Sequence, residues 1–243
     1  MIKEKTKSDQ SVAIILPTYC EAQTIESLIR KLLNSVPNAT IIVIDDSSPD
    51  GTAEIVRKLQ TQEKNLLLHV RPAKLGLGSA ITIGFHLALS LPNHPQFVVT
   101  MDADYSHSPR DIPILLNEAK DGKDLVVGSR YTNGGRIIGW NPVRLIISRI
   151  ANAIAFLVTK THLSDFTSGF RCYSAACLRS VLPHLHSQTY EIQIETIRQA
   201  SKMRFKIKET PITFTNRKAG KSKLTRTEIQ AFLKYIMKTK LNF

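Results

Sequence analysis

Cysteine is scarce in this chain, and its positions do not indicate a structural role. Cys20, Cys172 and Cys177 are an odd number, and none of them belongs to a Cys-x-x-Cys pair. Neither a disulfide framework nor a zinc site is therefore expected. This usage is typical of a reducing compartment, so we expect a cytoplasmic protein.

Long apolar runs, internal repeats and low-complexity segments are also absent from the sequence. Residues 1–10 are polar and charged, which excludes a signal peptide and predicts a disordered N-terminus. The stretch Val143–Val158 is apolar but contains Arg144 and Arg149, and it is shorter than the roughly 20 apolar residues that usually span a bilayer. We therefore expect no transmembrane segment.

Acidic residues are few relative to basic ones, at 20 Asp and Glu against 33 Lys and Arg, which gives a net charge of +13. A strongly basic chain favours polyanionic partners: nucleic acid, an anionic membrane surface or a phosphorylated substrate. Proline and glycine are not enriched, and 243 residues suffice for one large domain with a full core.

Strand-like and helix-like segments alternate along the first half of the chain. Short apolar runs predict strands at residues 12–16, 40–44, 66–70, 97–101 and 124–127. Apolar residues three or four apart predict helices at residues 24–33, 53–59 and 109–120, and one that ends near Leu91. This alternation predicts βαβ units, and therefore an α/β fold with a mostly parallel sheet.

Polar loops follow four of these strands. Residues 17–21, residues 45–50, Lys74 and residues 102–106 each come after the carboxyl end of a strand. Open α/β sheets bind ligands at this edge, so we expect the four loops to share one binding site.

Two of these loops contain patterns with two interpretations. Acidic groups such as Asp46 bond ribose or base edges in dinucleotide-binding folds, but Asp45 and Asp46 are also common turn residues. Gly76-x-Gly78 precedes a helix, where it could admit a phosphate or simply open the helix. The sequence leaves both alternatives open.

The carboxylates Asp102 and Asp104 follow the apolar strand at residues 97–101. On an extended segment, residues i and i+2 point to the same side, so these two carboxylates can face one point. Converging carboxylates favour a cation between them, and Mg²⁺ or Mn²⁺ prefers such oxygen ligands and shares them with phosphates. We therefore expect a metal-bridged diphosphate site. Alternatively, Asp102 caps a turn and Asp104 is the N-cap of the helix near Pro109.

Five segments in collinear order carry a family resemblance: Pro17–Glu21, Asp45–Thr52, Asp102–His107, Gly128–Tyr131 and Ser168–Arg171. They resemble the family 2 glycosyltransferases, which have the GT-A fold. With Arg144, Ser148 and residues 220–223, they resemble the dolichol-phosphate mannose synthases, or polyprenyl-phosphate mannosyltransferases. The resemblance covers residues 12–224, and Cys20 stands where the family usually has Asn.

The resemblance implies a fold, a reaction and a cofactor. The fold would be a GT-A (Rossmann-like) domain over residues 11–224, with a mostly parallel sheet and flanking helices. The reaction would transfer mannose from GDP-mannose to a dolichyl or polyprenyl phosphate with inversion, using Mg²⁺ or Mn²⁺. A UDP-glucose-dependent polyprenyl-phosphate glucosyltransferase is the alternative within the enzyme class.

The resemblance also implies roles for individual residues. Donor nucleotide binding falls to Pro17, Tyr19, Glu21, Asp46, Lys74, Asp102 and Ala103. Metal binding falls to Asp102, Asp104 and Ser106, and binding of the acceptor phosphate to Arg130, Arg144, Ser148, Arg217 and Lys223. The catalytic residues would be Asp104, Arg130 and Arg217.

Charge explains why arginines would suit such an acceptor. A phosphate monoester carries about −1.5 to −2 charges at pH 7 and needs little help from a general base. Arginine binds phosphate bidentately, so Arg130, Arg144 and Arg217 could hold one oxygen opposite the leaving group. Two alternatives stay open: residues 143–158 could be a core helix with a solvated Arg144, and Glu195 could orient an arginine, act as a base or form an ion pair.

Residues 225–243 are the last expected unit, an amphipathic helix. One face carries Ile229, Phe232, Leu233, Ile236, Met237 and Leu241, and the lysines lie elsewhere. A basic amphipathic helix suits a membrane interface, but the same stripe could dock on the core. We expect peripheral association with the cytoplasmic face of a membrane, with a small membrane-anchoring subunit as a further candidate partner.

Two other classes of function remain open on the sequence alone. The net charge suits a nucleic-acid-binding protein, although the carboxylates at the expected site would repel a phosphate backbone. A non-catalytic membrane scaffold is the other class, although it would not need Asp102, Asp104 and the three arginines. We therefore expect an enzyme whose partners are a nucleotide sugar, a polyprenyl phosphate and a membrane surface, and no nucleic acid.

Overall fold

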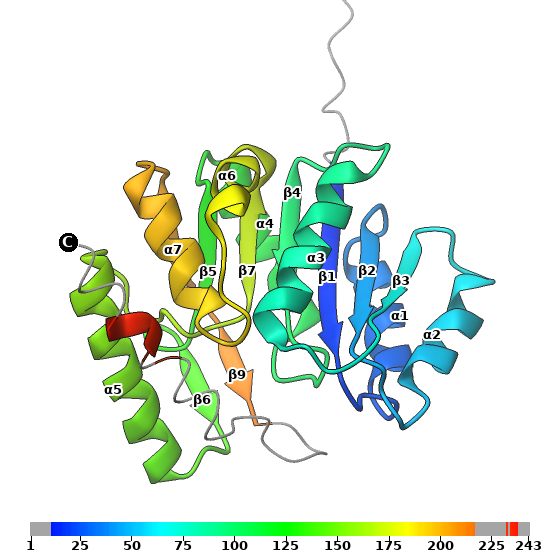
Figure 1. Cartoon of the computed structure of the whole chain (residues 1–243), viewed down its shortest axis with the longest axis horizontal. Coiled ribbons are helices and arrows are strands. Elements are labelled where there is room, and N and C mark those ends of the chain that lie inside the picture. Colours follow the sequence, from blue (N-terminus) through cyan, green and yellow to red (C-terminus); the bar gives the residue numbers. More distant parts are fainter. Residues whose placement is uncertain (1–10, 217–231, 233, 238–243) are drawn as a thin grey trace, which may run out of the picture.

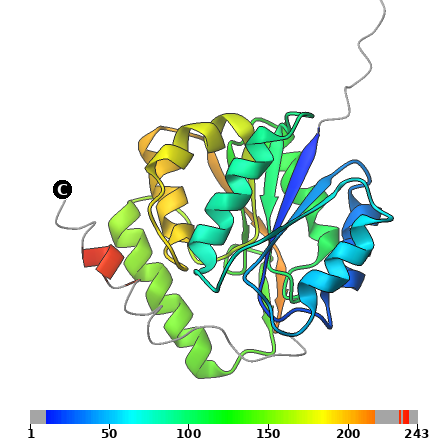
Figure 2. The same cartoon turned by 45° about the vertical axis from the view of Figure 1, so that its right-hand side comes forward.

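The computed structural model describes residues 11–216, 232 and 234–237. Residues 11–216 form three layers, a central seven-stranded sheet with helices on both of its faces (Figures 1 and 2). This arrangement confirms the expected α/β class with a mostly parallel sheet. Residues 1–10, where a disordered N-terminus is expected, lie outside the described residues.

The strands of the main sheet follow the order β3-β2-β1-β4-β7-β5-β8. Their bounds are Val12–Thr18 (β1), Thr40–Asp45 (β2), Leu66–Val70 (β3), Phe97–Thr100 (β4), Leu125–Ser129 (β5), Arg171–Ser174 (β7) and Ile207–Pro211 (β8). β7 runs antiparallel to β4 and β5, and the other pairings in this sheet are parallel. All five strands expected from apolar runs are present.

Helices cover the sheet on both sides. One face is covered by α1 (Ile25–Ser35), α2 (Thr52–Gln60) and α4 (Ile112–Lys120), and the other by α3 (Leu77–Ser90), α6 (Ala175–Val181) and α7 (Ile192–Lys202). Short 3₁₀ turns precede α4 (Pro109–Asp111) and follow α6 (Leu182–His184). Because side chains alternate along a strand, each face has its own apolar core: Ile14 packs into one and Ile15 into the other.

The expected binding edge lies at a crossover in this topology. The chain places β2 and β3 on one side of β1 and then returns to place β4 on the other side. The loops after β1 and β4 therefore diverge, which opens the crevice where such sheets bind ligands. Since β3, β2, β1 and β4 are consecutive neighbours, the four polar loops share one edge, as expected.

A smaller unit stands apart from the main sheet. β6 (Arg136–Ile138) pairs in parallel with β9 (Thr213–Thr215). After β6 the chain enters α5 (Pro142–Thr159). Asn141 is the N-cap of α5, because its side chain accepts a hydrogen bond from the Arg144 N–H at 2.8 Å. In Figures 1 and 2, α5 lies along the margin of the molecule, beside β6 and far from β3.

Helix α5 buries a narrow face and exposes a wide apolar one. Asn152, Ala155 and Val158 are buried. The exposed large apolar side chains are Val143, Ile146, Ile147, Ile150, Phe156 and Leu157. Among the described residues, α5 is the one helix long and apolar enough to cross a membrane, judged by length and composition alone. Its 18 residues lie at the short end of the roughly 17–25 residues of membrane spans.

Only a short piece of the expected C-terminal helix lies within the described residues. Phe232 and residues 234–237 are helical, and Phe232 and Tyr235 pack against the core that α3, α6 and α7 share. Figures 1 and 2 both place this piece beside α5. These contacts agree with the docked alternative for this piece, and the expected membrane role of the tail stays a prediction.

The three cysteines, all within the described residues, are free thiols, which agrees with the expected absence of disulfides. Cys20 is exposed, whereas Cys172 and Cys177 are buried. Burial raises the pKa of Cys177 to about 12 and raises that of Cys172 as well. Both buried thiols are therefore protonated and inert at neutral pH.

Candidate active site

Asp45, the first carboxylate after β2, shapes its own turn. It is fully buried, and its Oδ1 accepts hydrogen bonds from Thr18 Oγ1 at 2.8 Å and from Ser48 Oγ at 2.6 Å. Its Oδ2 accepts from the Ser48 N–H at 2.9 Å. For Asp45 the turn interpretation is therefore confirmed, and the residue also ties the loop after β1 to the loop after β2.

Asp46 forms a buried ion pair with Arg71, a partner that the sequence did not reveal. Arg71 Nε donates to Asp46 Oδ1 at 2.5 Å, and Arg71 Nη2 donates to the Gly76 carbonyl at 2.9 Å. The Leu75 N–H donates to Asp46 Oδ2 at 3.3 Å. Burial raises the pKa of Asp46 by more than Arg71 lowers it. Asp46 thus anchors the loop of Lys74 to the loop after β2.

The space over Gly76 and Gly78 is filled by protein. A Cβ atom on Gly78 would lie 2.5 Å from the Ser187 carbonyl oxygen. At the start of α3, the Ser79 N–H donates to the Gln188 carbonyl at 3.2 Å. The glycines therefore allow α3 to pack closely on residues 187–189, which supports the helix-opening alternative.

Three loops at the binding edge contain a non-glycine residue in the left-handed backbone region: Cys20 (φ 57°), Ser47 (φ 53°) and Tyr105 (φ 61°). Such conformations are uncommon and concentrate at functional sites. Lys74 and Tyr19, both expected at the donor nucleotide, meet at the same edge, since Lys74 Nζ lies 4.6 Å from the centroid of the Tyr19 ring.

The remaining expected donor residues lie at the ends of β1 and β4. Pro17 belongs to β1, and Ala103 is buried between the two aspartates of its loop. Glu21 is buried, and its N–H donates to Thr52 Oγ1 at 2.9 Å. The structure thus gathers the expected donor residues along one edge, as the collinear motifs imply.

The loop after β4 presents two carboxylates and a buried hydroxyl. Asp104 is buried and its Oδ1 accepts from the Ser106 N–H at 3.0 Å, whereas the Asp102 side chain is 42% exposed. Ser106 Oγ is buried without a hydrogen-bond partner among the described residues. The N-cap of the following 3₁₀ turn is Ser108, whose Oγ accepts from the Arg110 N–H at 3.3 Å. Asp104 as a helix N-cap is therefore wrong.

These oxygens suit a hard divalent cation. The buried Ser106 hydroxyl lies next to Asp104, and the Asp102 side chain is partly exposed at the same loop. In the part of the chain that the structure describes, no group of three or more His, Cys, Asp or Glu side chains could hold a metal. Mg²⁺ is usually bound through one or two carboxylates together with substrate phosphates and water, and the two carboxylates of this loop would suit such a site.

His107 and Gly169 fix the position of Asp102. The buried His107 ring stacks on Phe170 with centroids 5.1 Å apart, and its Nδ1 accepts the Asp102 N–H at 3.3 Å. Burial lowers the pKa of His107 by more than Asp102 and Asp104 raise it, so the ring is neutral and Nδ1 can accept. A Cβ atom on Gly169 would lie 3.3 Å from Asp102 Oδ1, so this glycine leaves room for the carboxylate.

Arg130, which follows β5, is held by a buried bidentate ion pair. Its Nε and Nη2 donate to the two carboxylate oxygens of Asp165 at 2.7 Å each, and Nη2 also donates to Thr167 Oγ1 at 2.6 Å. Burial lowers the pKa of Arg130 and raises that of Asp165, but the pairing outweighs burial for both groups. Both side chains are therefore charged. The two residues are 35 positions apart in the sequence, so no local pattern reveals the pair.

Arg144 and Ser148 lie one turn apart on α5, as expected. Arg144 Nη1 donates to Asn216 Oδ1 at 3.0 Å. Ser148 Oγ accepts from the Tyr131 hydroxyl at 2.8 Å. The core-helix alternative is correct for the buried face of α5 and wrong for its wide exposed face. Arg217 and Lys223, the other expected acceptor ligands, lie outside the described residues.

Two aromatic rings connect the arginines of this region. The Cζ atoms of Arg144 and Arg130 lie 4.1 and 5.2 Å from the centroid of the Trp140 ring. The Cζ atoms of Arg130 and Arg149 lie 5.6 and 6.0 Å from the centroid of the Tyr131 ring. Trp140 and Arg149 were not among the expected residues, because a lone aromatic before a helix and an arginine in an apolar stretch give no functional pattern.

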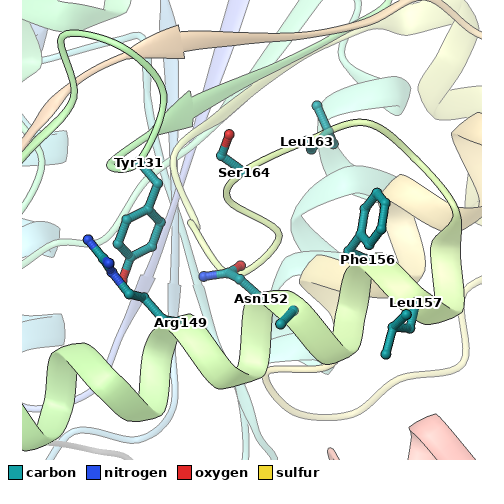
Figure 3. A pocket seen from close by; sticks show the side chains of 8 residues that line it. Tyr131, Arg149, Asn152, Phe156, Leu157, Leu163 and Ser164 are labelled. Carbon is teal, nitrogen blue, oxygen red and sulfur yellow. The ribbon is translucent and has the colours of Figure 1, made fainter.

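A groove of about 470 Å³ runs along α5, with Tyr131 and Arg149 at one end and Phe156 and Leu157 at the other (Figure 3). Its lining residues are Tyr131, Arg149, Asn152, Ala153, Phe156, Leu157, Leu163 and Ser164. Asn152 braces its floor, because its Oδ1 accepts the Phe166 N–H at 2.7 Å and its Nδ2 donates to the Ser148 carbonyl at 2.9 Å. A mostly apolar groove with the guanidinium group of Arg149 at one end suits a ligand with a charged head and an apolar chain.

Glu195 on α7 holds a neighbouring loop. Its Oε2 accepts hydrogen bonds from the His186 N–H at 3.0 Å and from the Ser187 N–H at 2.9 Å. Those two bonds fix the backbone that packs over the start of α3. The described hydrogen bonds of Glu195 therefore go to backbone amides, and not to an arginine.

Comparison with protein families identifies the class that this fold and site define. The Glycosyl transferase family 2 model matches residues 13–182, so the chain belongs to this family and is a glycosyltransferase. The chain is 34% identical over 224 residues to the polyprenol monophosphomannose synthase of Mycolicibacterium smegmatis, across 91% of this chain and 83% of that protein. It is also 34% identical over 215 residues to the undecaprenyl-phosphate mannosyltransferase of Micrococcus luteus, across 88% and 87% of the two chains. The family resemblance of the motifs is thus confirmed.

Solved structures confirm the GT-A fold. The glucosyl-3-phosphoglycerate synthase of Mycobacterium tuberculosis, in complex with Mn²⁺, UDP and glucosyl-3-phosphoglycerate, matches with a TM-score of 0.67 at 19% identity. Its complex with Mn²⁺, UDP-glucose and phosphoglyceric acid also gives 0.67, at 20% identity. Both matches cover 96% of this chain and 79% of the other.

Proposed function

We propose that this glycosyltransferase transfers mannose from GDP-mannose to a dolichyl or other polyprenyl phosphate, with inversion at the anomeric carbon. The observation that carries the proposal is a site with two chemically different sides. Carboxylates after β4 suit a metal-bound nucleoside diphosphate, and arginines around α5 suit a phosphate acceptor. The names of the two relatives at 34% identity support mannose as the sugar and a polyprenyl carrier as the acceptor.

On the donor side, Asp102, Asp104 and Ser106 would hold Mg²⁺ or Mn²⁺. When bound, the ion would offset the charge that develops on the departing diphosphate. Lys74 lies at the same edge and adds a positive charge, while its contact with Tyr19 keeps the two loops together. The role of these side chains is to bind and orient the donor so that its leaving group departs along one direction.

On the acceptor side, the substrate supplies its own nucleophile. A phosphate oxygen forms the new bond to the anomeric carbon as the bond from that carbon to the diphosphate breaks, and the diphosphate leaves with the electron pair. Attack from the face opposite the leaving group inverts the anomeric centre. Because the phosphate is already an anion, no general base is required, which agrees with Glu195 being engaged by backbone amides.

Arg144, Ser148 and Arg130 would hold the acceptor phosphate. Arg144 and Ser148 present a guanidinium and a hydroxyl one helical turn apart. Arg130 donates hydrogen bonds to Asp165 from Nε and Nη2, and its Nη1 is not part of that ion pair. The buried pair would therefore fix Arg130 in orientation, while Arg144 supplies most of the attraction for the phosphate.

We further infer that the exposed face of α5 lies in the membrane interface. Its large apolar side chains, at positions 143, 146, 147, 150 and 157, recur at helical spacing. A net charge of +13 would draw the protein to an anionic surface. A helix lying there would bring Arg144 to the depth of a lipid phosphate, and the groove beside it would receive the apolar chain. A small membrane-anchoring subunit is the alternative occupant of this face.

The test is a matrix of donors and acceptors assayed with the purified chain. GDP-mannose and UDP-glucose would each be combined with a polyprenyl phosphate, the corresponding polyprenol and no acceptor, in the presence of Mn²⁺. We expect transfer only with GDP-mannose and the phosphate, and a product with the β configuration. Transfer with UDP-glucose alone would establish the glucosyltransferase instead, and transfer to the polyprenol would contradict the assignment of the acceptor site.

A further inference from the structure

Trp140 contacts two of the three arginines around α5, and it is the chain's single tryptophan. It lies between β6 and the N-cap of α5. The guanidinium carbon of Arg144 is 4.1 Å from the ring centroid, and that of Arg130 is 5.2 Å away. The edge of Trp140 also meets Phe214 of β9, with centroids 5.3 Å apart and planes at 72°. One indole ring therefore joins β9, α5 and the residue after β5.

The chemistry of this contact depends on the ring and not on its N–H group. The Trp140 Nε1 atom is buried without a hydrogen-bond partner among the described residues. A buried N–H that donates nothing is costly, and leucine or phenylalanine would avoid the cost. What tryptophan adds is the strongest negative face of the aromatic side chains, to which guanidinium groups are attracted.

Two guanidinium groups close to one ring repel each other, so something must hold them together. Asp165 offsets the charge of Arg130 from one side, at the two 2.7 Å contacts of the ion pair. Arg144 comes from a different element, α5. Its guanidinium group lies over the Trp140 ring and donates a hydrogen bond to the Asn216 side-chain oxygen. The indole is the contact that both arginines share.

We propose that Trp140 is a positioning residue for the acceptor phosphate, because its ring holds Arg144 and Arg130 close enough to bind one phosphate together. This inference rests on the proposed function, in which these arginines bind the phosphate of a prenyl phosphate. Trp140 itself touches neither the sugar nor the diphosphate in this proposal. Weakening its negative face should therefore weaken acceptor binding and leave donor binding unchanged.

The single tryptophan makes a direct test possible. Biosynthetic incorporation of mono-, di- and trifluorotryptophan would alter only position 140, drawing electron density from the ring with little change in its size. Affinity for farnesyl phosphate, measured by calorimetry without donor, should fall stepwise with the number of fluorine atoms. From unmodified to trifluorinated protein we expect a loss on the order of 2- to 30-fold. The KM for GDP-mannose should not follow the series.

Substitutions provide a second, independent measurement. Trp140→Phe should retain part of the affinity for farnesyl phosphate and Trp140→Leu should lose more, with KM for the acceptor rising and kcat changing less. Phe205→Leu is the matched control, an aromatic-to-leucine change beside the amino end of β8, whereas Phe214 follows the carboxyl end of that strand. It should leave both KM values unchanged. Thermal melts would confirm that each variant is folded.

The outcomes separate this inference from the proposed function. If unmodified protein binds farnesyl phosphate and the fluorinated series binds it equally well, Trp140 is only a packing residue and the inference is wrong. If Trp140→Leu impairs binding of donor and acceptor alike, the inference is also wrong. If fluorination weakens binding of farnesyl phosphate but no mannose is transferred to it, the positioning role stands and the proposed reaction fails.

Discussion

The donor side and the acceptor side of the site are built in different ways. At the donor edge, polar contacts follow the pairing of parallel strands: Thr18 pairs with Asp45 in the β1–β2 register and also bonds its carboxylate. On the acceptor side, Arg130 bonds Asp165 and Arg144 bonds Asn216, across 35 and 72 residues of sequence. The pairing of β6 with β9 helps to bring Asn216 to the start of α5, and the Trp140 ring contacts both arginines.

This difference separates a rigid half from an adaptable half. Hydrogen bonds and strained backbone hold the carboxylates of the donor edge, which suits a metal ion with strict geometric demands. On the acceptor side, Asp165 holds Arg130 by a bidentate ion pair, so the more adaptable group is Arg144, which contacts the Trp140 ring and donates to Asn216. A contact with an aromatic face is less directional than a hydrogen bond, which suits the capture of a phosphate that arrives on a lipid.

The largest loss of activity is expected at the donor edge. Asp104→Asn keeps the shape of the side chain and removes a charge that the metal would need, so kcat should fall on the order of 10³-fold. Removal of divalent ions with EDTA should have a similar effect on the unmodified protein, and Mn²⁺ should restore activity. Ser106→Ala, which removes a neutral ligand, should cost much less. Turnover that survives both Asp104→Asn and EDTA would show that the metal site is assigned wrongly.

The largest loss of stability is expected on the acceptor side. Asp165→Asn leaves Arg130 buried without its counter-charge, which should cost about 3–5 kcal/mol of the free energy of unfolding. The double change Asp165→Asn with Arg130→Met should recover part of that loss. Denaturant unfolding measures both. If Asp165→Asn is as stable as the unmodified protein, the pair does not hold the acceptor side together.

The same pair predicts a dependence of stability on pH. Arg130 lowers the pKa of Asp165 in the folded state, against the effect of burial, so the folded state binds fewer protons than the unfolded state. The stabilisation is present above the unfolded pKa of about 3.9 and is lost as the pH falls below it. Unfolding at pH 3 and at pH 6 should differ less for Asp165→Asn than for the unmodified protein.

Arg144 offers a cleaner test of the acceptor than Arg130, whose loss would also disrupt the core. Arg144→Ala should lower kcat/KM for the polyprenyl phosphate by roughly 10- to 150-fold, because a charged hydrogen bond contributes about 1.5–3 kcal/mol. The KM for GDP-mannose should change little. Arg136→Ala, an exposed arginine on β6, is the control and should match the unmodified protein. An equal loss in donor affinity would place Arg144 at the nucleotide.

Membrane binding should depend on α5 more than on the C-terminal tail. The double change Ile147→Glu with Ile150→Glu should weaken flotation on anionic liposomes by roughly 10²-fold or more, since each isoleucine contributes about 1.5–3 kcal/mol when buried. Ile114→Glu, on α4, is the matched control for an exposed isoleucine outside α5. A variant truncated after Arg226, which lacks the C-terminal tail, is tested in the same flotation experiment. Flotation that needs the tail and ignores the α5 changes would return the membrane contact to residues 227–243.

The smallest effect is expected at Cys20. Its backbone is left-handed, and asparagine, which the family usually has there, tolerates that conformation better. Cys20→Asn should therefore raise the free energy of unfolding by less than about 1 kcal/mol and leave turnover unchanged. A substantial change in turnover would mean that the thiol itself takes part at the donor edge.

Much of the donor side was predictable because its signals are local. Buried parallel strands are continuous apolar runs, and the polar residues that follow each run lie at the same edge by the rules of the fold. The Asp102–Asp104 spacing and the turn at Asp45 are both contained in short stretches of sequence. The same holds on the acceptor side for the helical spacing within residues 143–158. Collinear motifs then added the family, which the comparisons confirm.

The tertiary structure alone decided which charges are paired and which faces are open. Two buried ion pairs join segments that are distant in the chain: Asp46 with Arg71, and Arg130 with Asp165. The sequence around each residue gives no indication of its partner. β7 is antiparallel because the chain enters the space between β4 and β5 from the carboxyl ends of those two strands. Apolar periodicity shows that α5 has two faces, but the packing of Ala155 and Val158 decides which face is buried. Long-range packing sets these features because burial and charge pairing depend on neighbours in space rather than in sequence.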